Sequence, residues 1–240
     1  MHNWYTMKFV KLDYTAQIKG GPVFETTDKK KAEKEGIVDE KRPYVPLPIV
    51  VGGGQVIAGL DEALKDLSVG AEKKIEIPPE KGYGERNPAL LRIVPIKVFR
   101  KEKINPIPGM PVELDGRPAR VQTVAGGRVR VDFNHDLAGK TLVYDVKIVS
   151  EASTEKDTAL FLVERNFATT EGFDVKVAGK KAEIALPEKV ARDRAIVVRK
   201  ASLSAELFKY LELHEVSYSE VWKNPKAEAP KKDDTPKDKA

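Results

Sequence analysis

A histidine and an aspartate stand next to each other in the stretch "NHDLAGKTLVYDV" (134–146), at His135 and Asp136. Such a pair could move a proton, but adjacent residues on an extended strand point to opposite faces, so both reach one substrate only across a bend. No serine lies in the strand–turn–helix context of a nucleophile elbow. We therefore expect His135 to organise the turn at residues 137–139 by hydrogen bonds rather than to act as an acid or base.

Two other groups of residues could do chemistry. The three glycines at 52–54 precede a helical pattern and could cradle a phosphate, but no Gly-Lys-Ser/Thr ending follows, so they predict a tight turn. The carboxylates Glu25, Asp61 and Glu62 are not brought together by their spacing, which gives a hydrolase little support. The chain has no cysteine and three histidines without metal-ligand spacing, so we predict neither a metal site nor a cofactor.

What remains is a set of aromatic and aliphatic residues at strand ends, in a loop and on a helix. The set comprises Tyr14, Phe24, Leu47, Ile57, Leu60, Tyr83 and Tyr144. An ordinary hydrophobic core is one interpretation. Three of the seven are tyrosines, however, and a buried tyrosine hydroxyl needs a partner, which favours a binding site.

These residues must be positioned by a small sheet and one helix. Alternation of apolar and polar residues predicts strands at 8–18, 71–77 and 141–149, and a short apolar strand starts at residue 47. Ile57, Leu60, Leu64 and Leu67 form one face of a helix within 55–70. The charged segment 28–43 reads as a solvated loop with a helical turn. The expected domain is a half-open antiparallel sheet around one helix, formed by residues 1–85 with 134–152.

Two further domains are expected. Residues 86–133 form an insert, because 85–110 has four prolines that exclude one long helix, and 111–133 is a meander with turns at 115–116 and 126–127. Residues 153–224 form a C-terminal α+β domain. We expect strands at 159–167, 174–187 and 194–202, and a helix at 204–213 with Ser204 as its N-cap. Residues 225–240 are expected to be disordered.

Composition limits the environment and the partners. No apolar run reaches the ~20 residues of a membrane span, and the start lacks a signal-peptide pattern, so we expect a cytoplasmic protein without membrane contact. The net charge of +5 among 33% charged residues reads as a solvated surface, and we expect no nucleic-acid partner. A nucleic-acid-binding protein that uses "GGRVRVDF" (126–133) and the C-terminal domain is an alternative.

Four segments together resemble one family. They are "DYTAQIKGGPVFETT" (13–27), "LPIVVGGGQVIAGLDEAL" (47–64), "VGAEKKIEIPPEKGYG" (69–84) and "TLVYDVKIV" (141–149). In order and spacing they resemble the FKBP-type peptidyl-prolyl cis-trans isomerases. The stretch before Tyr144 resembles the SlyD-like, long archaeal type, in which a chaperone domain is inserted in the flap. The resemblance implies an α+β fold: an FKBP-like antiparallel half-barrel sheet around one helix, a β-rich insert and a C-terminal α+β domain.

The resemblance also implies roles for individual residues. Tyr14, Phe24, Glu25, Leu47, Ile57, Leu60, Tyr83 and Tyr144 match the family's catalytic pocket, with the Tyr83 hydroxyl on a substrate carbonyl. The family's backbone pairing with the peptide falls on Gln55 and Val56, and its further substrate contacts fall on His135 and Leu137. Leu60 stands at a floor position that is often tryptophan, Glu25 where aspartate is usual, and Leu47 where an aromatic residue is common. These differences make the pocket less aromatic.

The implied function is peptidyl-prolyl isomerisation (rotamase activity) that accelerates proline-limited folding of unfolded or partly folded polypeptides. Apolar residues of the insert are the expected client-binding surface of a chaperone: Ile93, Val94, Ile96, Val98, Phe99 and Met110. A chaperone or adaptor with little catalysis is the alternative. The C-terminal domain could form a homodimer or only close its own core.

Overall fold

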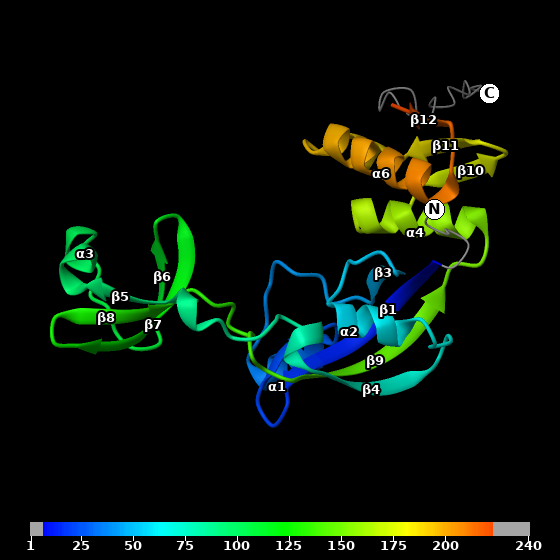
Figure 1. Cartoon of the computed structure of the whole chain (residues 1–240). Coiled ribbons are helices and arrows are strands. Elements are labelled where there is room, and N and C mark those ends of the chain that lie inside the picture. The colour runs from blue at the N-terminus through cyan, green and yellow to red at the C-terminus, as the bar shows by residue number, and fades with distance from the viewer. Residues whose placement is uncertain (1–6, 223–240) are drawn as a thin grey trace, which may run out of the picture. The chain divides into compact units, whose positions relative to one another are not determined.

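The computed structural model describes residues 7–222, so the tail expected at 225–240 lies outside the described residues. The chain divides into two compact units, one of residues 10–151 and one of residues 7–9 with those after 151. Figure 1 traces the elements of each unit. Within residues 7–222, no helix combines the length and the apolar character needed to cross a bilayer.

The first unit is built on a five-stranded antiparallel sheet. Its strands are β1 (Lys8–Ile18), β2 (Val23–Thr26), β3 (Leu47–Val51), β4 (Glu72–Ile77) and β9 (Leu142–Glu151), in the order β2-β1-β9-β4 with β3 paired to β1. Tyr14 pairs with Val146, and Ala16 pairs with Tyr144. Because alternate residues of paired strands share a face, Tyr14 and Tyr144 lie on the same face of the sheet.

One helix packs on that face. Helix α2 (Ala58–Leu64) lies against the sheet (Figure 1). It buries Leu60 and Leu64 in the core, as their spacing predicts. It ends at Leu64 rather than near Gly70, and Leu67 reaches the same core from the following turn. The charged segment forms a second helix, α1 (Lys29–Glu35), because the Asp28 side chain caps its first turn.

The insert has a sheet and a core of its own. Strands β5 (Leu91–Pro95), β6 (Pro111–Leu114), β7 (Arg117–Ala125) and β8 (Arg128–Asp132) follow the order β5-β8-β7-β6, and α3 (Ile96–Lys101) follows β5. Both turns of the meander are where they were predicted, with positive φ at residues 115–116 and 126–127. The core contains Phe99, Val129 and Val131, all fully buried. Prolines shorten each element, so neither a long helix nor a long strand forms.

The two chain segments that lead into and out of the insert are hydrogen-bonded to each other. The Gly139 N–H donates to the Gly84 carbonyl at 2.8 Å, and the Phe133 N–H donates to the Leu90 carbonyl at 3.0 Å. The Asn134 side chain accepts from the Asn87 N–H at 2.9 Å. The insert therefore starts and ends at one place on the first sheet's domain.

The second unit is α+β, as expected, but two of its predicted strands are helices. Its elements are α4 (Glu155–Phe167), β10 (Asp174–Ala178), β11 (Lys181–Leu186), α5 (Glu188–Ala191), α6 (Ile196–Leu211) and β12 (Glu215–Glu220). The predicted strand at 159–167 is wrong because a capping box of Thr154 and Asp157 starts a helix there. The predicted strand at 194–202 is wrong as well. Its β-branched residues begin α6, so Ser204 lies inside that helix and bonds to the Tyr218 hydroxyl instead of capping.

The strands of this unit were partly foreseen. β10 and β11 form the hairpin predicted around Gly179, whereas β12, which pairs in parallel with β11, was not predicted. The segment of β12, "EVSYSE", alternates over only two apolar residues, Val216 and Tyr218, and its residues are largely exposed. Such an edge strand has little periodic signal.

Candidate functional site

A cavity of about 420 Å³ opens between the sheet and the α2 side of the first unit. Its lining residues are Leu12, Tyr14, Glu25, Leu47, Ile49, Gly54, Gln55, Val56, Ile57, Leu60, Tyr83 and Tyr144. The volume lies in the usual range for small-ligand sites. Nine of these residues were singled out from the sequence, and the structure brings them together around one hollow.

Leu12, Ile49 and Gly54 are the lining residues that were not predicted for this site, and Gly54 was considered only as part of the glycine turn. Leu12 precedes Tyr14 by two residues on β1, and Ile49 follows Leu47 by two on β3. Period-two alternation puts each of these pairs on one face of its strand. That signal was present in the sequence and could have found both residues.

Aromatic rings form one wall of the cavity. The Tyr14 and Tyr144 ring centroids are 6.0 Å apart, and the Phe24 ring meets that of Tyr144 edge-on at 6.4 Å. Tyr83 and Tyr144 both line this wall, and their side chains are close enough for each to affect the pKa of the other. Phe24 itself is not a lining residue. It supports the wall from behind and faces a smaller hollow of about 180 Å³.

An ion pair fixes the polar edge of the cavity. Arg42 holds the Glu25 carboxylate at 2.7 Å and donates to the Tyr14 hydroxyl at 3.0 Å. The side chains of Arg42 and Glu25 are each about one-third exposed, 33% and 34%. Sequence reasoning missed Arg42 because it closes a segment of charges that read as solvated. No periodic pattern distinguishes it from its neighbours there.

The tyrosine hydroxyls of the cavity are held in their neutral form. Burial raises the pKa of Tyr14 and of Tyr144 far above the ordinary value, and the charge of Glu25 adds to both shifts. Burial, followed by the charge of Glu25, also raises the pKa of Tyr83. The three hydroxyls therefore remain hydrogen-bond donors throughout the physiological pH range.

The glycine turn has no room for a phosphate. The Asp61 carboxylate accepts hydrogen bonds from the N–H groups of Gly52 at 2.8 Å and Gly54 at 3.4 Å. An internal anion thus occupies the position that a phosphate would need, as expected for a structural turn. The Gln55 side chain accepts from the Val50 N–H at 2.9 Å and holds the same turn to β3.

His135 and Leu137 line a different hollow, of about 380 Å³, at the base of the insert. His135 and Asp136 lie in a turn rather than on a strand, and Asp136 forms an ion pair with Arg120 at 2.6 Å. The Nδ1 atom of His135 accepts from the Leu137 N–H at 3.1 Å, so the turn-forming role predicted for His135 is confirmed.

One contact still connects His135 to the cavity. Its ring stacks on the Tyr83 ring, with centroids 4.2 Å apart and planes at 3°. His135 therefore touches the cavity through a lining tyrosine instead of through a face of its own.

The remaining carboxylates are dispersed. Glu62 pairs with Lys81, while Asp61 caps the glycine turn and Glu25 pairs with Arg42, so the three do not converge. Among residues 7–222, no three histidine, aspartate or glutamate side chains are placed to hold one metal ion.

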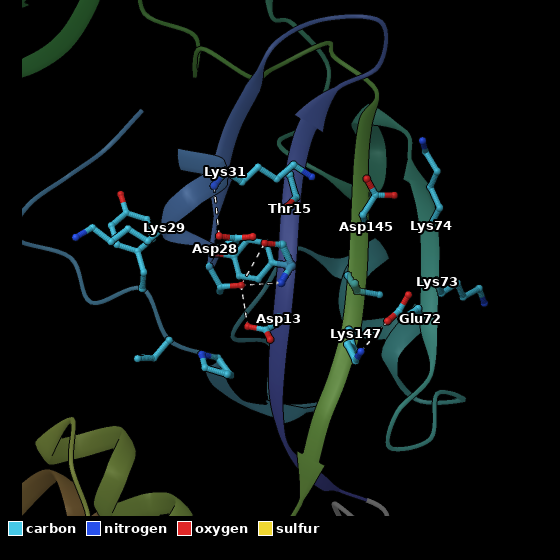
Figure 2. Close-up of a pocket in the computed structure, with 16 residues that line it drawn as sticks. Asp13, Thr15, Asp28, Lys29, Lys31, Glu72, Lys73, Lys74, Asp145 and Lys147 are labelled. Carbon is cyan, nitrogen blue, oxygen red and sulfur yellow. Dashed lines mark hydrogen bonds and ion pairs between the residues drawn. The ribbon is translucent and has the colours of Figure 1, made fainter. Parts of the chain in front are cut away.

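A larger hollow of about 920 Å³ lies on the opposite, polar face of the sheet. Figure 2 shows Asp13 and Thr15 on β1, Asp145 and Lys147 on β9, and Glu72, Lys73 and Lys74 on β4. Lys147 pairs with Glu72 at 2.7 Å across the strands. The charges are of both signs and two of them pair across the strands, as on an ordinary solvated sheet face.

The apolar residues predicted on the insert have different exposures. Ile93 is 66% exposed, whereas Val94, Ile96, Val98 and Met110 are partly buried. Phe99 is fully buried in the insert's core and offers no surface to a client, which corrects its assignment to the client-binding set.

Comparison with known proteins gives matches along most of the chain. Residues 92–137 match a family model described as "FKBP26, IF domain", and residues 155–223 match one described as "FKBP26_C-terminal". A short-type peptidyl-prolyl cis-trans isomerase of Methanocaldococcus jannaschii is 38% identical over 58% of the chain and 88% of its own length. A probable FKBP-type 16 kDa peptidyl-prolyl cis-trans isomerase of Pseudomonas fluorescens is 31% identical over 49% of the chain and 80% of its own length. The FKBP-type peptidyl-prolyl cis-trans isomerase SlyD of Helicobacter pylori is 31% identical over 50% of the chain and 68% of its own length.

Proposed function

Because the chain belongs to the family of FKBP-type peptidyl-prolyl cis-trans isomerases, we propose that its 420 Å³ cavity binds a prolyl residue and isomerises the preceding peptide bond. One observation carries the assignment of the site: tyrosine hydroxyls stand at the edge of a cavity whose walls are aliphatic side chains and aromatic rings. Such a cavity can take an apolar ring and still hydrogen-bond the peptide on either side of it.

The reaction breaks no bond. Rotation about an Xaa-Pro amide must cross a barrier of about 18–20 kcal/mol, because resonance holds the amide planar. The twisted amide has less charge separation than the planar one, so an apolar cavity favours it relative to water. Each tenfold acceleration needs about 1.4 kcal/mol of such preferential stabilisation. Neither a nucleophile nor a proton transfer is required.

Some residues of the cavity bind the prolyl ring, and others orient the peptide. Leu47, Ile57 and Leu60 hold the prolyl ring, with Leu60 at the buried floor. The Tyr83 hydroxyl donates to a carbonyl of the substrate when the peptide replaces its contact with Tyr144. Arg42 keeps Glu25 and Tyr14 in fixed positions at the edge, so the cavity does not have to reorganise when the amide twists.

The first test is cis–trans exchange of a short Xaa-Pro peptide with a hydrophobic residue before the proline, followed by NMR exchange spectroscopy. Phe24→Ala removes the ring that supports Tyr144 and should lower kcat/KM by about tenfold or more. Val45→Ala, at a residue that is 54% exposed and outside the cavity, serves as the control. Absence of acceleration by the unaltered protein would refute the assignment.

We further propose that the insert binds unfolded clients and holds them near the cavity. Its support is the exposed Ile93, with Ile107 58% exposed on the same domain. A tethered client meets the cavity at a raised effective concentration. Replacing residues 86–133 by a short linker should leave peptide isomerisation intact and slow proline-limited refolding of a protein. Unimpaired refolding would contradict client binding.

An adaptor with little catalysis is the competing function. Tyr83→Phe combined with Phe24→Ala separates the two, because help in refolding would survive these changes in an adaptor and decline in an isomerase. Folding of the double variant is checked by circular dichroism before the comparison.

Self-association through the second unit is also a proposal. Helix α6 exposes Val197 (74%), Val198 (71%) and Phe208 (43%), and a second copy would cover such side chains. The molar mass in solution, measured by light scattering for the unaltered chain and for Phe208→Asp, distinguishes a dimer from a monomer.

A further inference from the structure

The positive charge of this chain is concentrated in the insert. Between residues 86 and 133 there are ten lysines and arginines against four aspartates and glutamates, a net charge of +6. The whole chain has a net charge of +5, so everything outside the insert carries −1. The basic character of the protein is therefore a property of one domain.

Several cations of the insert are already in use. Arg86 and Arg120 form ion pairs with Asp132 and Asp136. The guanidinium groups of Arg92 and Arg117 lie 5.1 and 5.3 Å from the centre of the Phe133 ring. Among the described residues, six further cations of the insert form no ion pair or ring contact: Lys97, Arg100, Lys101, Lys103, Arg128 and Arg130. Unpaired cations at a surface attract anionic groups from solution.

Two of these six share a sheet face with an exposed aliphatic side chain. Val129 and Val131 of β8 point into the insert's core, so Arg128 and Arg130 project from the opposite face. Strand β5 lies beside β8 (Figure 1), and its Ile93 pairs with Arg130. Ile93 is 66% exposed. We call this surface of Ile93, Arg128 and Arg130 the basic face.

We propose that the basic face selects unfolded polypeptide segments in which acidic side chains neighbour apolar ones. The inference rests on the proposed function of the insert in client binding, and it names the chemistry of the client. An apolar side chain of the segment packs on Ile93. Carboxylates beside it pair with the planar guanidinium groups, which bind carboxylates in two-point contacts.

A nucleic acid is a poorer fit to the same face. Single-stranded nucleic acids bind where bases stack on aromatic rings. The insert has two aromatic residues: Phe99 is fully buried, and Phe133 lies beneath two guanidinium groups. Neither ring is free to receive a base, whereas the exposed aliphatic side chain suits a polypeptide.

The experiment uses the full chain and two fluorescein-labelled peptides without proline, so that the prolyl cavity does not contribute. Both peptides carry the same apolar residues, and one has aspartate and glutamate where the other has asparagine and glutamine. We expect the acidic peptide to bind about tenfold more tightly by fluorescence anisotropy at low salt. The difference should shrink as sodium chloride is added.

Matched variants assign the effect to the basic face. Arg128→Gln with Arg130→Gln should abolish the preference, and Arg128→Lys with Arg130→Lys should restore part of it, because lysine keeps the charge but not the two-point geometry. Lys73→Gln with Lys74→Gln removes the same charge from exposed positions of β4, outside the insert, and should keep the preference. Thermal unfolding followed by circular dichroism verifies that each variant is folded.

Each result decides the proposal. Equal binding of the two peptides overturns charge selection but leaves client binding by the insert in place. Binding of neither peptide by a protein that still isomerises Xaa-Pro peptides overturns client binding as well. Displacement of the acidic peptide by a single-stranded oligonucleotide at physiological salt would instead make the face a nucleic-acid site.

Discussion

The cavity and the insert use the same kinds of side chain in opposite ways. In the cavity, aliphatic side chains face a hollow, and the polar groups at its edge pair with one another, as Arg42 does with Glu25 and Tyr14. In the insert, Ile93 faces solvent beside cations without partners. Catalysis of one bond rotation gains from fixed geometry, whereas capture of variable clients gains from an open surface that waits for its counter-charges.

The largest expected effect is a loss of stability in the insert that leaves the cavity unchanged. Asp132 is 5% exposed and accepts hydrogen bonds from Gln122 and from the backbone and side chain of Asn134. Asp132→Ala leaves these donors and Arg86 without their partner and should lower the free energy of unfolding of the insert by about 2 kcal/mol. Urea denaturation measures this loss.

Peptide isomerisation by the Asp132→Ala variant is the informative readout. It should stay near the unaltered rate, because none of these contacts reaches the cavity. Glu113→Ala, at an exposed acidic residue of the same insert, is the control. A parallel loss of peptide isomerisation would show that the two regions are not independent.

The next effect tests the fixed edge of the cavity. Glu25→Gln removes the charge that holds Arg42 and should lower kcat/KM for a short Xaa-Pro peptide by about tenfold, or about 1.4 kcal/mol. Glu76→Gln breaks an exposed ion pair with Lys19 elsewhere on the sheet and should change little. Equal activity of both variants would mean that the edge is not preorganised by this ion pair.

A smaller effect is expected at the stacked histidine. His135→Ala removes the ring beneath Tyr83 and should lower kcat by about threefold with little change in KM, since Tyr83 keeps its place in the chain. His135→Phe retains a flat ring and should recover most of kcat. Failure of His135→Phe to recover kcat would point to loss of the turn instead, because phenylalanine cannot accept the hydrogen bond from the Leu137 N–H.

The smallest expected effect is a flat pH profile. The pKa of each cavity tyrosine is raised in the folded state, so the hydroxyls stay neutral while an unfolded tyrosine would ionise near pH 10. Peptide isomerisation should therefore not fall between pH 7 and about pH 9.5. The free energy of unfolding, unlike the activity, should fall at higher pH. The contribution of Tyr14 and Tyr144 is complete below the unfolded pKa and is lost as the pH rises towards the folded one.

Measuring the free energy of unfolding from pH 8 to 11 checks this expected loss of stability. The fall above pH 10 should be less steep in Tyr14→Phe, because a phenylalanine cannot ionise in the unfolded chain. An activity loss below pH 9 that Tyr83→Phe removes would show that a tyrosine ionises early and would contradict the raised pKa values.

The sequence predicted the first unit well because its signals are local and periodic. Alternation along β1 and β9 and the spacing of Leu60 and Leu64 each have one interpretation. The second unit was harder, because short apolar runs such as the one at residues 159–163 fit a strand or a buried helix equally. The capping residues Thr154 and Asp157 could have decided between them.

The residues of the candidate site also differ in how far local patterns in the sequence could predict them. Residues that matched a pattern came together, whereas Arg42 was invisible because its partners, Glu25 and Tyr14, lie 17 and 28 positions away. The position of Phe24 behind the wall and of His135 beneath Tyr83 could not be read either. Both depend on how side chains from separate segments pack, which neither spacing nor composition encodes.

The segments that enter and leave the insert are hydrogen-bonded to each other, and this bears on whether the insert can be replaced by another domain. The chain leaves the catalytic domain just after Tyr83 and returns just before Tyr144, and both side chains line the cavity. Gly84 and Gly139 close this gap with a backbone hydrogen bond of 2.8 Å. We therefore expect the catalytic domain to accept, in place of the insert, another domain whose two ends lie side by side. We expect such a replacement to change which clients the proposed insert surface binds and to leave peptide isomerisation intact.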